Sequence, residues 1–315
     1  MSGAFDLMAR AAFHVGPLEP VPGWYFGQWD RRNPRAWARR ALWRLARERN
    51  YDGPVTTGWY FDLRFNHHLS GDMSQCTYVD GRYEPNEMYA MAQLIKPGMC
   101  FVDVGANAGI FTIMAARLTG ERGVVHAFEP SPRDRVRLEA NISLNRLTNV
   151  TVHSEALGRS PGRAVLTVSG AERPGHNTIG GFMYAEDAAA YSIEVEVTTL
   201  DDVAEATRLT RLDVMKVDVE GFETAVLQGG RAALARFRPV MVVEAQDESL
   251  RQAGSSASEL LALVRELDYE VKVFGPSGMA EPVDGERITG LNLLCVPQRV
   301  ERPVGRPRPA PSQDR

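Results

Sequence analysis

Several residues suited to chemistry follow the ends of apolar segments. Asp103, Gly105, Asn107 and Gly109 occupy alternate positions after an apolar run and before a helical pattern. Glycines there allow a tight turn and close approach of a ligand, and the N-terminus of the following helix adds positive potential. Glu129 ends the next apolar run 20 residues after Gly109, where a doubly wound fold places an acid to bind a ribose. This spacing predicts a nucleoside cofactor site.

The same loop indicates which cofactor binds. Dinucleotide sites use three glycines as G-x-G-x-x-G, whereas this loop is D-x-G-x-N-x-G, with Asn107 in place of the middle glycine. The carboxylate of Asp103 would repel a pyrophosphate but attract the α-ammonium of a methionine group. The loop therefore favours S-adenosylmethionine over NAD, and a dehydrogenase is disfavoured.

A second group of acids follows later strands. Asp218 and Glu220 come after a buried strand, at the sheet edge where ligands bind, and side chains two apart in an extended segment point the same way. Crowding raises the pKa of one carboxyl, which suits a general base for an alcohol. Alternatively, Asp218 orients a ligand and Glu220 caps the next helix. Glu244 ends a strand at this edge and is a candidate to contact the substrate. Asp218 and Glu244 could hold a divalent metal, but no His or further Asp is placed to complete a set, so we expect no metal.

A polar, Gly-rich loop contains His176 and Asn177. It lies between the third and fourth predicted strands, whose connections flank the ligand crevice in a doubly wound sheet. We therefore expect His176 and Asn177 to hydrogen-bond the acceptor substrate and not the cofactor. The alternative is a polar surface loop.

Alternating elements position these residues. Apolar strands are predicted at 99–104, 124–128, 150–153, 214–219 and 240–244, and helices at 110–119, 132–145, 222–228 and 256–267. This alternation predicts an α/β, doubly wound, mostly parallel sheet covered on both faces. The last two strands, 269–274 and 291–296, lack a helix between them and should pair antiparallel. Strands at 163–168 and 192–197 indicate an insertion at about 160–200, over the edge of the sheet.

The N-terminal residues 1–50 are rich in aromatic residues and arginine. A helix is predicted from Pro34 to about residue 49, with Asn33 as its N-cap. Trp37 and Leu45 belong to an apolar stripe that we expect to pack against the rest of the protein. Trp43 falls on the opposite face among arginines. The alternative is that this face contacts an anionic surface or the substrate, with Trp43 as an interfacial anchor.

Length and composition limit the remaining possibilities. The 315 residues carry a net charge of −4, which argues against a nucleic-acid-coating protein. Three cysteines without ligand spacing predict neither a disulfide framework nor a zinc site. No signal peptide or membrane span is evident, so we expect a cytoplasmic protein. Residues 51–298 form the predicted main domain, with its core at 77–298, and 299–315 a disordered tail.

In their order along the chain, these motifs resemble the FkbM-type S-adenosylmethionine-dependent methyltransferases. The resemblance extends over about residues 77–250. It comprises GRYEPNE at 81–87, FVDVGANAGIFT at 101–112, FEPSP at 128–132, EALG at 155–158, GHNTIG at 175–180, TLDD at 199–202, MKVDVEGFETAVLQG at 215–229 and PVMVVE at 239–244. Residues 1–50 and the tail lie outside it.

The resemblance implies a class I methyltransferase (Rossmann-like) fold, a seven-stranded sheet whose last strand is reversed. It implies that the 103–109 loop lines the methionine end of the cofactor and that Glu129 holds its ribose. Glu155 would lie near the adenine. Glu84 would close over the cofactor, unless it serves only as an acid at the start of the helix that follows.

Together, residues and resemblance predict an S-adenosylmethionine-dependent methyltransferase. The expected acceptor is a hydroxyl oxygen on a sugar, glycolipid or natural product. The alternatives are an N-methyltransferase on the same scaffold and a methyltransferase-like protein that binds the cofactor without turnover. The intact D-V-E-G and G-H-N-T segments favour an enzyme.

Overall fold

The computed structural model describes residues 2–22, 34–51, 53–71, 73–170, 176–179, 189–274, 277–283 and 292–298. The predicted tail at 299–315, the N-cap at Asn33 and most of the Gly-rich loop lie outside these residues.

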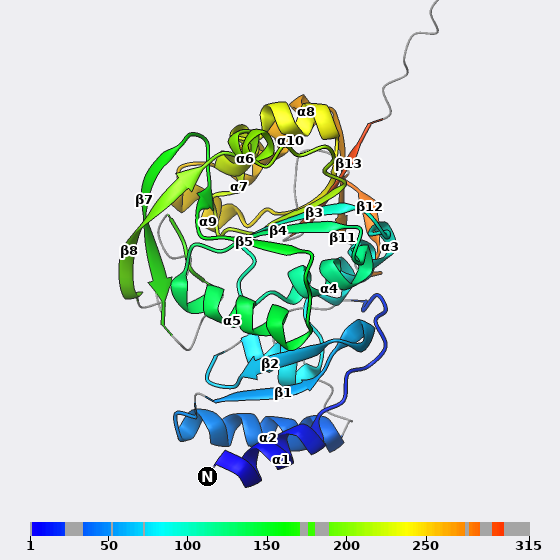
Figure 1. The fold of residues 1–315 in the computed structure, drawn as a ribbon, viewed down its shortest axis with the longest axis vertical. Helices are drawn as coiled ribbons and strands as arrows, with labels where there is room; N and C mark the ends of the chain where they lie inside the picture. The colour runs from blue at the N-terminus through cyan, green and yellow to red at the C-terminus, as the bar shows by residue number, and fades with distance from the viewer. Residues whose placement is uncertain are drawn as a thin grey trace, which may run out of the picture.

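An eight-stranded sheet forms the centre of the molecule, with strand order β12-β11-β13-β10-β9-β3-β4-β5 (Figure 1). The strands are β3 (Cys100–Val104), β4 (Val124–Phe128), β5 (Val150–His153), β9 (Val214–Val217), β10 (Val240–Glu244), β11 (Tyr269–Phe274), β12 (Ala280–Pro282) and β13 (Asn292–Pro297). Neighbours from β5 to β10 pair in parallel, whereas β13 runs antiparallel between β10 and β11. The α/β class I methyltransferase prediction, with its reversed last strand, is confirmed, although β12 at the edge adds an eighth strand to the seven expected.

Helices cover both faces of this sheet (Figure 1). One face carries α6 (Leu200–Ala206), α7 (Glu223–Gln228), α8 (Arg231–Phe237) and α10 (Ala257–Glu266), and α9 (Asp247–Gln252) follows β10. The other face carries α3 (Pro85–Leu94), α4 (Ile110–Thr119) and α5 (Pro132–Leu144). Short crossovers between parallel strands produce this two-sided cover. The order of strands reverses between β3 and β9, so the loops after these two strands meet at one edge.

Two strands of the predicted insertion form a small separate sheet. β7 (Gly162–Ser169) pairs antiparallel with β8 (Ala189–Thr198), and β6 (Ala156–Leu157) pairs with the end of β8. In Figure 1 this sheet lies beside the end of the central sheet that β5 forms. Residues 176–179 return to it, because Thr178 bridges Thr167 of β7.

The N-terminal region forms a further layer beneath α4 and α5 (Figure 1). It contains α1 (Ser2–Ala12), α2 (Pro34–Glu48) and the hairpin β1 (Pro54–Gly58) with β2 (Arg64–His68). It also contains a short 3₁₀ helix, η1 (Tyr60–Asp62), and a π-helix, η2 (Gln75–Asp80). The backbone N–H of Asn66 in β2 donates to Oδ1 of Asn141 in α5 at 3.0 Å. This bond joins the layer to the helices that cover the sheet.

Helix α2 packs through the face opposite to the one we predicted. Its buried residues include Arg39 and Trp43, whereas Trp37 is 55% exposed. Nε of Arg39 donates to the carbonyl of Val79 at 2.7 Å, and Nε1 of Trp43 donates to Ser74 at 2.8 Å. The predicted packing is therefore wrong for Trp37, although Leu45 of the same stripe is partly buried against the apolar cluster that contains Trp43. Because Trp43 is itself buried, its alternative role as an interfacial anchor is also wrong. Distant polar partners let an arginine lie on the buried side.

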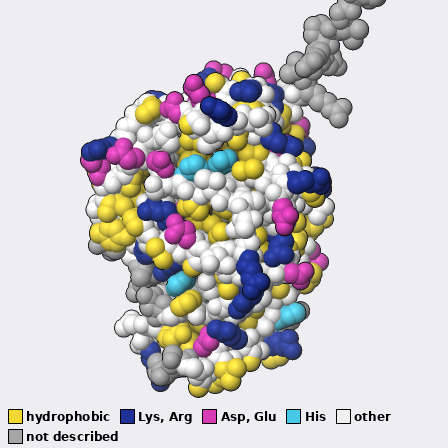
Figure 2. Space-filling model, in the orientation of Figure 1, with side chains coloured by type: hydrophobic (Ala, Val, Ile, Leu, Met, Phe, Trp, Pro, Cys, Tyr) yellow, Lys and Arg dark blue, Asp and Glu magenta, His cyan; other side chains and the backbone are white. Residues whose placement is uncertain are grey.

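The surface carries both signs of charge. On the face shown in Figure 2, basic and acidic side chains are interspersed over most elements. Among the helices that the structure describes, none combines the length and apolar character that crossing a bilayer requires.

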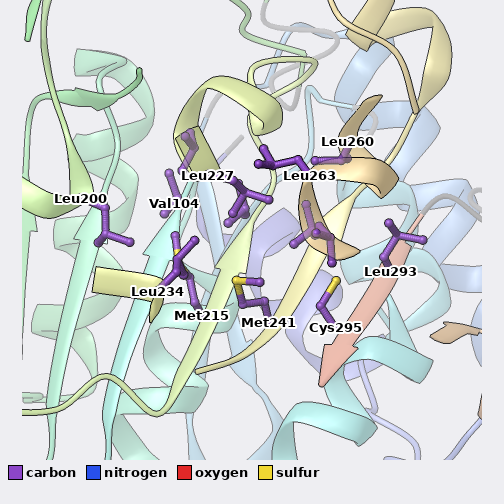
Figure 3. Close-up of a cluster of buried hydrophobic side chains, with 14 of the residues drawn as sticks. Val104, Leu200, Met215, Leu227, Leu234, Met241, Leu260, Leu263, Leu293 and Cys295 are labelled. Atoms are coloured by element: carbon purple, nitrogen blue, oxygen red, sulfur yellow. The ribbon is translucent and has the colours of Figure 1, made fainter. Parts of the chain in front are cut away.

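Alternate side chains of the strands build the two sides of the core. Val104, Met215 and Met241 point to the side of α7, α8 and α10, where they meet leucines of those helices (Figure 3). The intervening residues Phe101, Val214 and Val242 pack on the side of α3 and α4. Because this pattern has a period of two, the next residues on the α4 side are Asp103, Lys216 and Glu244. The apolar core thus gives way to charged side chains at the carboxyl edge.

Candidate functional site

The loop after β3 is held in a shape that ordinary side chains rarely adopt. Gly105 has φ 82°, and a Cβ there would overlap the carbonyl oxygen of Asp218. Asn107 has φ 47°, and Gly109, with φ 88°, is the N-cap of α4. The glycine at 105 therefore serves the close approach of two loops of the protein, which the sequence analysis assigned to a ligand.

Glu129 joins the end of β4 to this loop. It is 4% exposed, its Oε2 accepts the backbone N–H of Asn107 at 2.8 Å, and its Oε1 accepts that of Ser131 at 2.8 Å. Burial, helped by the charge of Asp134, raises the pKa of Glu129 to about 8, and the two backbone bonds partly offset this. Glu129 thus lies beside the predicted cofactor loop. Its role at a ribose stays a prediction, as does that of Glu155, which is partly buried just after β5.

A buried lysine lies at the centre of the edge. Lys216 of β9 is the direct partner of Asp103 of β3 in the parallel register and is 3% exposed. Its Nζ bonds the carboxylate of Asp218, lies 3.8 Å from Oε2 of Glu84, and lies 4.7 Å from the centre of the Phe111 ring. Lys216 was not among the site residues that we predicted. Its position in a strand, two residues before Asp218, indicated that both side chains could lie on the same side of the sheet.

Asp103 and Glu84 approach this lysine from two other elements. Burial raises the pKa of Asp103 to about 6, against the opposing effects of Lys216 and of a hydrogen bond from Thr112. Glu84 has φ 37° at the start of α3, where its side chain makes no capping bond. Burial raises its pKa to about 8, and Lys216 opposes the shift. The side chain of Glu84 therefore faces the edge and does not serve only to start a helix.

Three carboxylates converge where β9 and β10 end. Asp218, Glu220 and Glu244 each offer an oxygen within 4.8 Å of the others. Glu220 has φ 52° in a turn, so the extended geometry that we assumed for it is wrong, although the turn also brings it to Asp218. Burial raises the pKa of Glu244 well above its usual value, and the charges of Asp218 and Glu220 add to this. Our expectation that these acids hold no metal stays a prediction.

Another acid fixes this turn. Oε1 of Glu223 accepts the backbone N–H of Val219 at 3.0 Å and that of Gly221 at 3.1 Å. Burial raises the pKa of Glu223 to about 7. Glu223 therefore holds the turn in place. The N-cap of α7 is Phe222, without a side-chain capping bond, so the alternative that Glu220 caps this helix is wrong. The sequence carried the signal that we missed, an acid in the first turn of α7.

Segment 176–179 contacts both the start of α5 and the turn that follows β9. Nδ2 of Asn177 donates to Asp134 at 2.6 Å, and its Oδ1 accepts the backbone N–H of Ser169 at 3.1 Å. Oγ1 of Thr178 donates to the carbonyl of Glu220 at 3.0 Å. The amide of Asn177 thus anchors the loop to the start of α5, and its contact with a substrate stays a prediction. His176 is partly buried, and its contact with a substrate stays a prediction.

The sequence of this chain is similar to one protein family and to several methyltransferases. The Methyltransferase FkbM domain model matches residues 103–271. Methyltransferase 1 of Beauveria bassiana (strain ARSEF 2860) is 31% identical over 147 residues, which cover 41% of this chain and 57% of that protein. 31-O-demethyl-FK506 methyltransferase FkbM of Streptomyces tacrolimicus is 31% identical over 196 residues, covering 54% and 72%. 2-O-methyltransferase NoeI of Sinorhizobium fredii (strain NBRC 101917 / NGR234) is 25% identical over 183 residues, covering 54% and 73%.

Proposed function

The chain belongs to the FkbM methyltransferase family, and from this premise we propose that it transfers a methyl group from S-adenosylmethionine to a hydroxyl oxygen. When bound, S-adenosylmethionine supplies a methyl group on a positively charged sulfur. The observation that carries the proposal is that the Glu129–Asn107 contact and the carboxylates after β9 and β10 lie at one edge of the sheet.

The residues at this edge suit such a donor. Glu129 offers a carboxyl beside the backbone of Asn107, where a ribose diol can be bound. Asp103 and Glu84 add carboxyl groups with only Lys216 between them, so the site favours a cationic ligand. NAD, with its pyrophosphate, would meet these acids unfavourably.

Asp218 is the proposed base. It takes the proton of the acceptor hydroxyl as the new carbon–oxygen bond forms and the carbon–sulfur bond breaks. Glu220, within 4.8 Å of it, is the next candidate. The remaining work of the site is to align the two reactants and to exclude water, which can account for several orders of magnitude in rate.

The acceptor is proposed to be a hydroxyl of a sugar, glycolipid or natural product. Two of the relatives carry O-methyl chemistry in their names, 31-O-demethyl-FK506 methyltransferase and 2-O-methyltransferase. The chain spans about 57% of the first relative and little more than 70% of these two, so their acceptors are models for its own only at the level of chemical class.

The test pairs binding with turnover. Calorimetry with S-adenosylmethionine and NAD should give heat only for the former, and a metabolite extract with labelled donor should identify the acceptor by mass spectrometry. Asp218→Asn should retain donor affinity and lower kcat by roughly 10²–10⁴-fold. The matched control is Glu205→Gln, an exposed acid of α6.

Two outcomes would contradict this proposal. No binding of S-adenosylmethionine would remove the donor, and full turnover by both Asp218→Asn and Glu220→Gln would remove the base. EDTA should leave activity unchanged. Loss of activity in EDTA that Mg²⁺ restores would instead show that carboxylates at this edge act through a divalent cation.

A further inference from the structure

Lys216 is a buried cation that the proposed chemistry does not yet use. Burying an ammonium is costly unless carboxylates and hydrogen bonds compensate for the lost water. Lys216 has this compensation from three elements, since Asp218 follows its own strand, Asp103 lies on β3, and Glu84 precedes α3. The face of Phe111 on α4 closes the fourth side at 4.7 Å.

The three acids are not equivalent partners. Asp218 is in direct hydrogen-bond contact with Nζ, whereas the nearest oxygen of Glu84 lies at 3.8 Å. Asp103 is engaged by the hydroxyl of Thr112. The ammonium group of a lysine has three N–H donors, so a hydrogen bond to Asp218 leaves two donors that can face the other acids. The contact therefore holds one oxygen of Asp218, and because the side chain is 20% exposed, the second oxygen can face a ligand.

Other titratable groups face the same cluster from the elements packed around it. They are Tyr83 and Glu87 from the start of α3, Glu220 and Glu223 from the turn after β9, and Glu244 from β10. All of these are acids or a phenol, so Lys216 is surrounded by groups that its charge stabilises when they ionise. Lys216 is thus well placed to set the orientation of the Asp218 carboxylate.

We propose that Lys216 is a positioning residue for methyl transfer, which holds the carboxylate of Asp218 toward the acceptor hydroxyl. The inference rests on the proposed function. When Asp218 accepts the hydroxyl proton it becomes neutral, and Asp103, whose pKa of about 6 leaves it ionised at neutral pH, remains as a countercharge for the ammonium of Lys216. The lysine does not itself gain or lose a proton. The loop bearing the base and the segment bearing Glu84 are therefore joined through one cation.

A double-mutant cycle tests whether Lys216 acts through Asp218. The variants are Lys216→Met, Asp218→Asn and the pair together, because methionine keeps the length and apolar stem of lysine. We expect Lys216→Met to lower kcat by at least tenfold in the wild-type background. In the Asp218→Asn background the further loss should be less than threefold, since the carboxylate to be positioned is already gone.

Two measurements separate positioning from a merely structural role. Calorimetry should show that Lys216→Met binds S-adenosylmethionine no more than twofold more weakly than wild type, because removing a positive charge does not disfavour a cationic ligand. Lys272→Met is the matched control. Lys272 also lies near a carboxylate, with 3.6 Å between its Nζ and Oε1 of Glu270, but it belongs to β11 and should leave kcat unchanged.

The outcomes distinguish this inference from the function on which it rests. Additive losses in the cycle, or a tenfold loss of donor affinity in Lys216→Met, would overturn the positioning role in an active enzyme. If the wild type transfers no methyl group, the proposed function fails and the inference fails with it. Should Lys216→Met not fold, the cycle is run with Lys216→Gln. Failure of both variants to fold would show a role in stability and overturn the inference.

Discussion

Two opposing effects act on the pKa of the Glu129 carboxyl. Its two oxygens satisfy the backbone N–H groups of Asn107 and Ser131, which favours the ionised form, while burial favours the neutral form. Burial prevails, with the pKa raised to about 8. The side chain therefore changes charge in a pH range in which binding experiments are routine, and any ligand that prefers one form of Glu129 will show this in its affinity.

We predict that affinity for S-adenosylmethionine rises as pH increases from 6.5 to 9. A ribose diol donates hydrogen bonds, so it prefers the carboxylate, which forms as pH passes about 8. Glu129→Gln should bind more weakly by about 1.5–3 kcal/mol at pH 9 and vary less with pH. Calorimetry at several pH values on both proteins measures the difference. Equal pH dependence in the two would remove Glu129 from the ribose.

Single residues show where sequence reasoning was sufficient. Asp103 and Glu129 could be placed because Asp103 lies near the end of β3 and Glu129 directly follows β4, and parallel neighbouring strands end at the same edge. Lys216 was overlooked because lysine in a strand is usually exposed, and only its register with Asp103 shows that it is buried. The bond from Asn177 to Asp134 could not be predicted because the two residues lie 43 positions apart in sequence.

Among the helices and strands, some were predicted correctly from the sequence and others were not. The strands Val124–Phe128, Val150–His153 and Val240–Glu244 and the helix Ile110–Thr119 have the bounds we predicted. The orientation of α2 could not be predicted. Its sequence offers an apolar stripe, but the carbonyl of Val79 and the hydroxyl of Ser74 stabilise the other face by accepting hydrogen bonds from Arg39 and Trp43.

The orientation of α2 gives a prediction about its two tryptophans. Trp43→Ala should lower the free energy of unfolding by about 3–5 kcal/mol, because it opens a cavity and leaves Ser74 without its donor. Trp37→Ala should change it by no more than about 0.5 kcal/mol, since the side chain is 55% exposed. Urea unfolding of both variants measures this. A larger loss for Trp37→Ala would restore the face first predicted from the sequence.

Across the whole molecule, the N-terminal layer contains its own buried titratable group. His67 of β2 is fully enclosed by aromatic rings, among them Phe13, Trp59 and Tyr78. Its two ring nitrogens lie 2.7 Å from Oγ1 of Thr57 and 3.1 Å from Oγ1 of Thr77. Burial lowers the pKa of His67 to about 3.

The pH dependence of stability follows from that shift. The unfolded chain binds a proton at His67 near pH 6.5, but the folded protein does so only near pH 3. The contribution of neutral His67 is therefore complete above about pH 6.5 and is lost as pH falls toward 3, by up to about 1.4 kcal/mol per pH unit. Wild type should lose stability more steeply than His67→Gln between pH 6.5 and 4 in urea titrations. Parallel curves would contradict it.

Strand β13 arrives last during synthesis, yet its place is between β10 and β11, both made earlier. While the ribosome is still translating residues 292–297, β10 ends the growing sheet with an unpaired edge, and β11 has no sheet neighbour to join except β12. An open edge of this kind is a site for unwanted pairing with other chains. The loops after β3 and β9 are thus synthesised before the strand that joins β10 to β11. We therefore expect chains arrested before residue 292 to be cut by protease within β11.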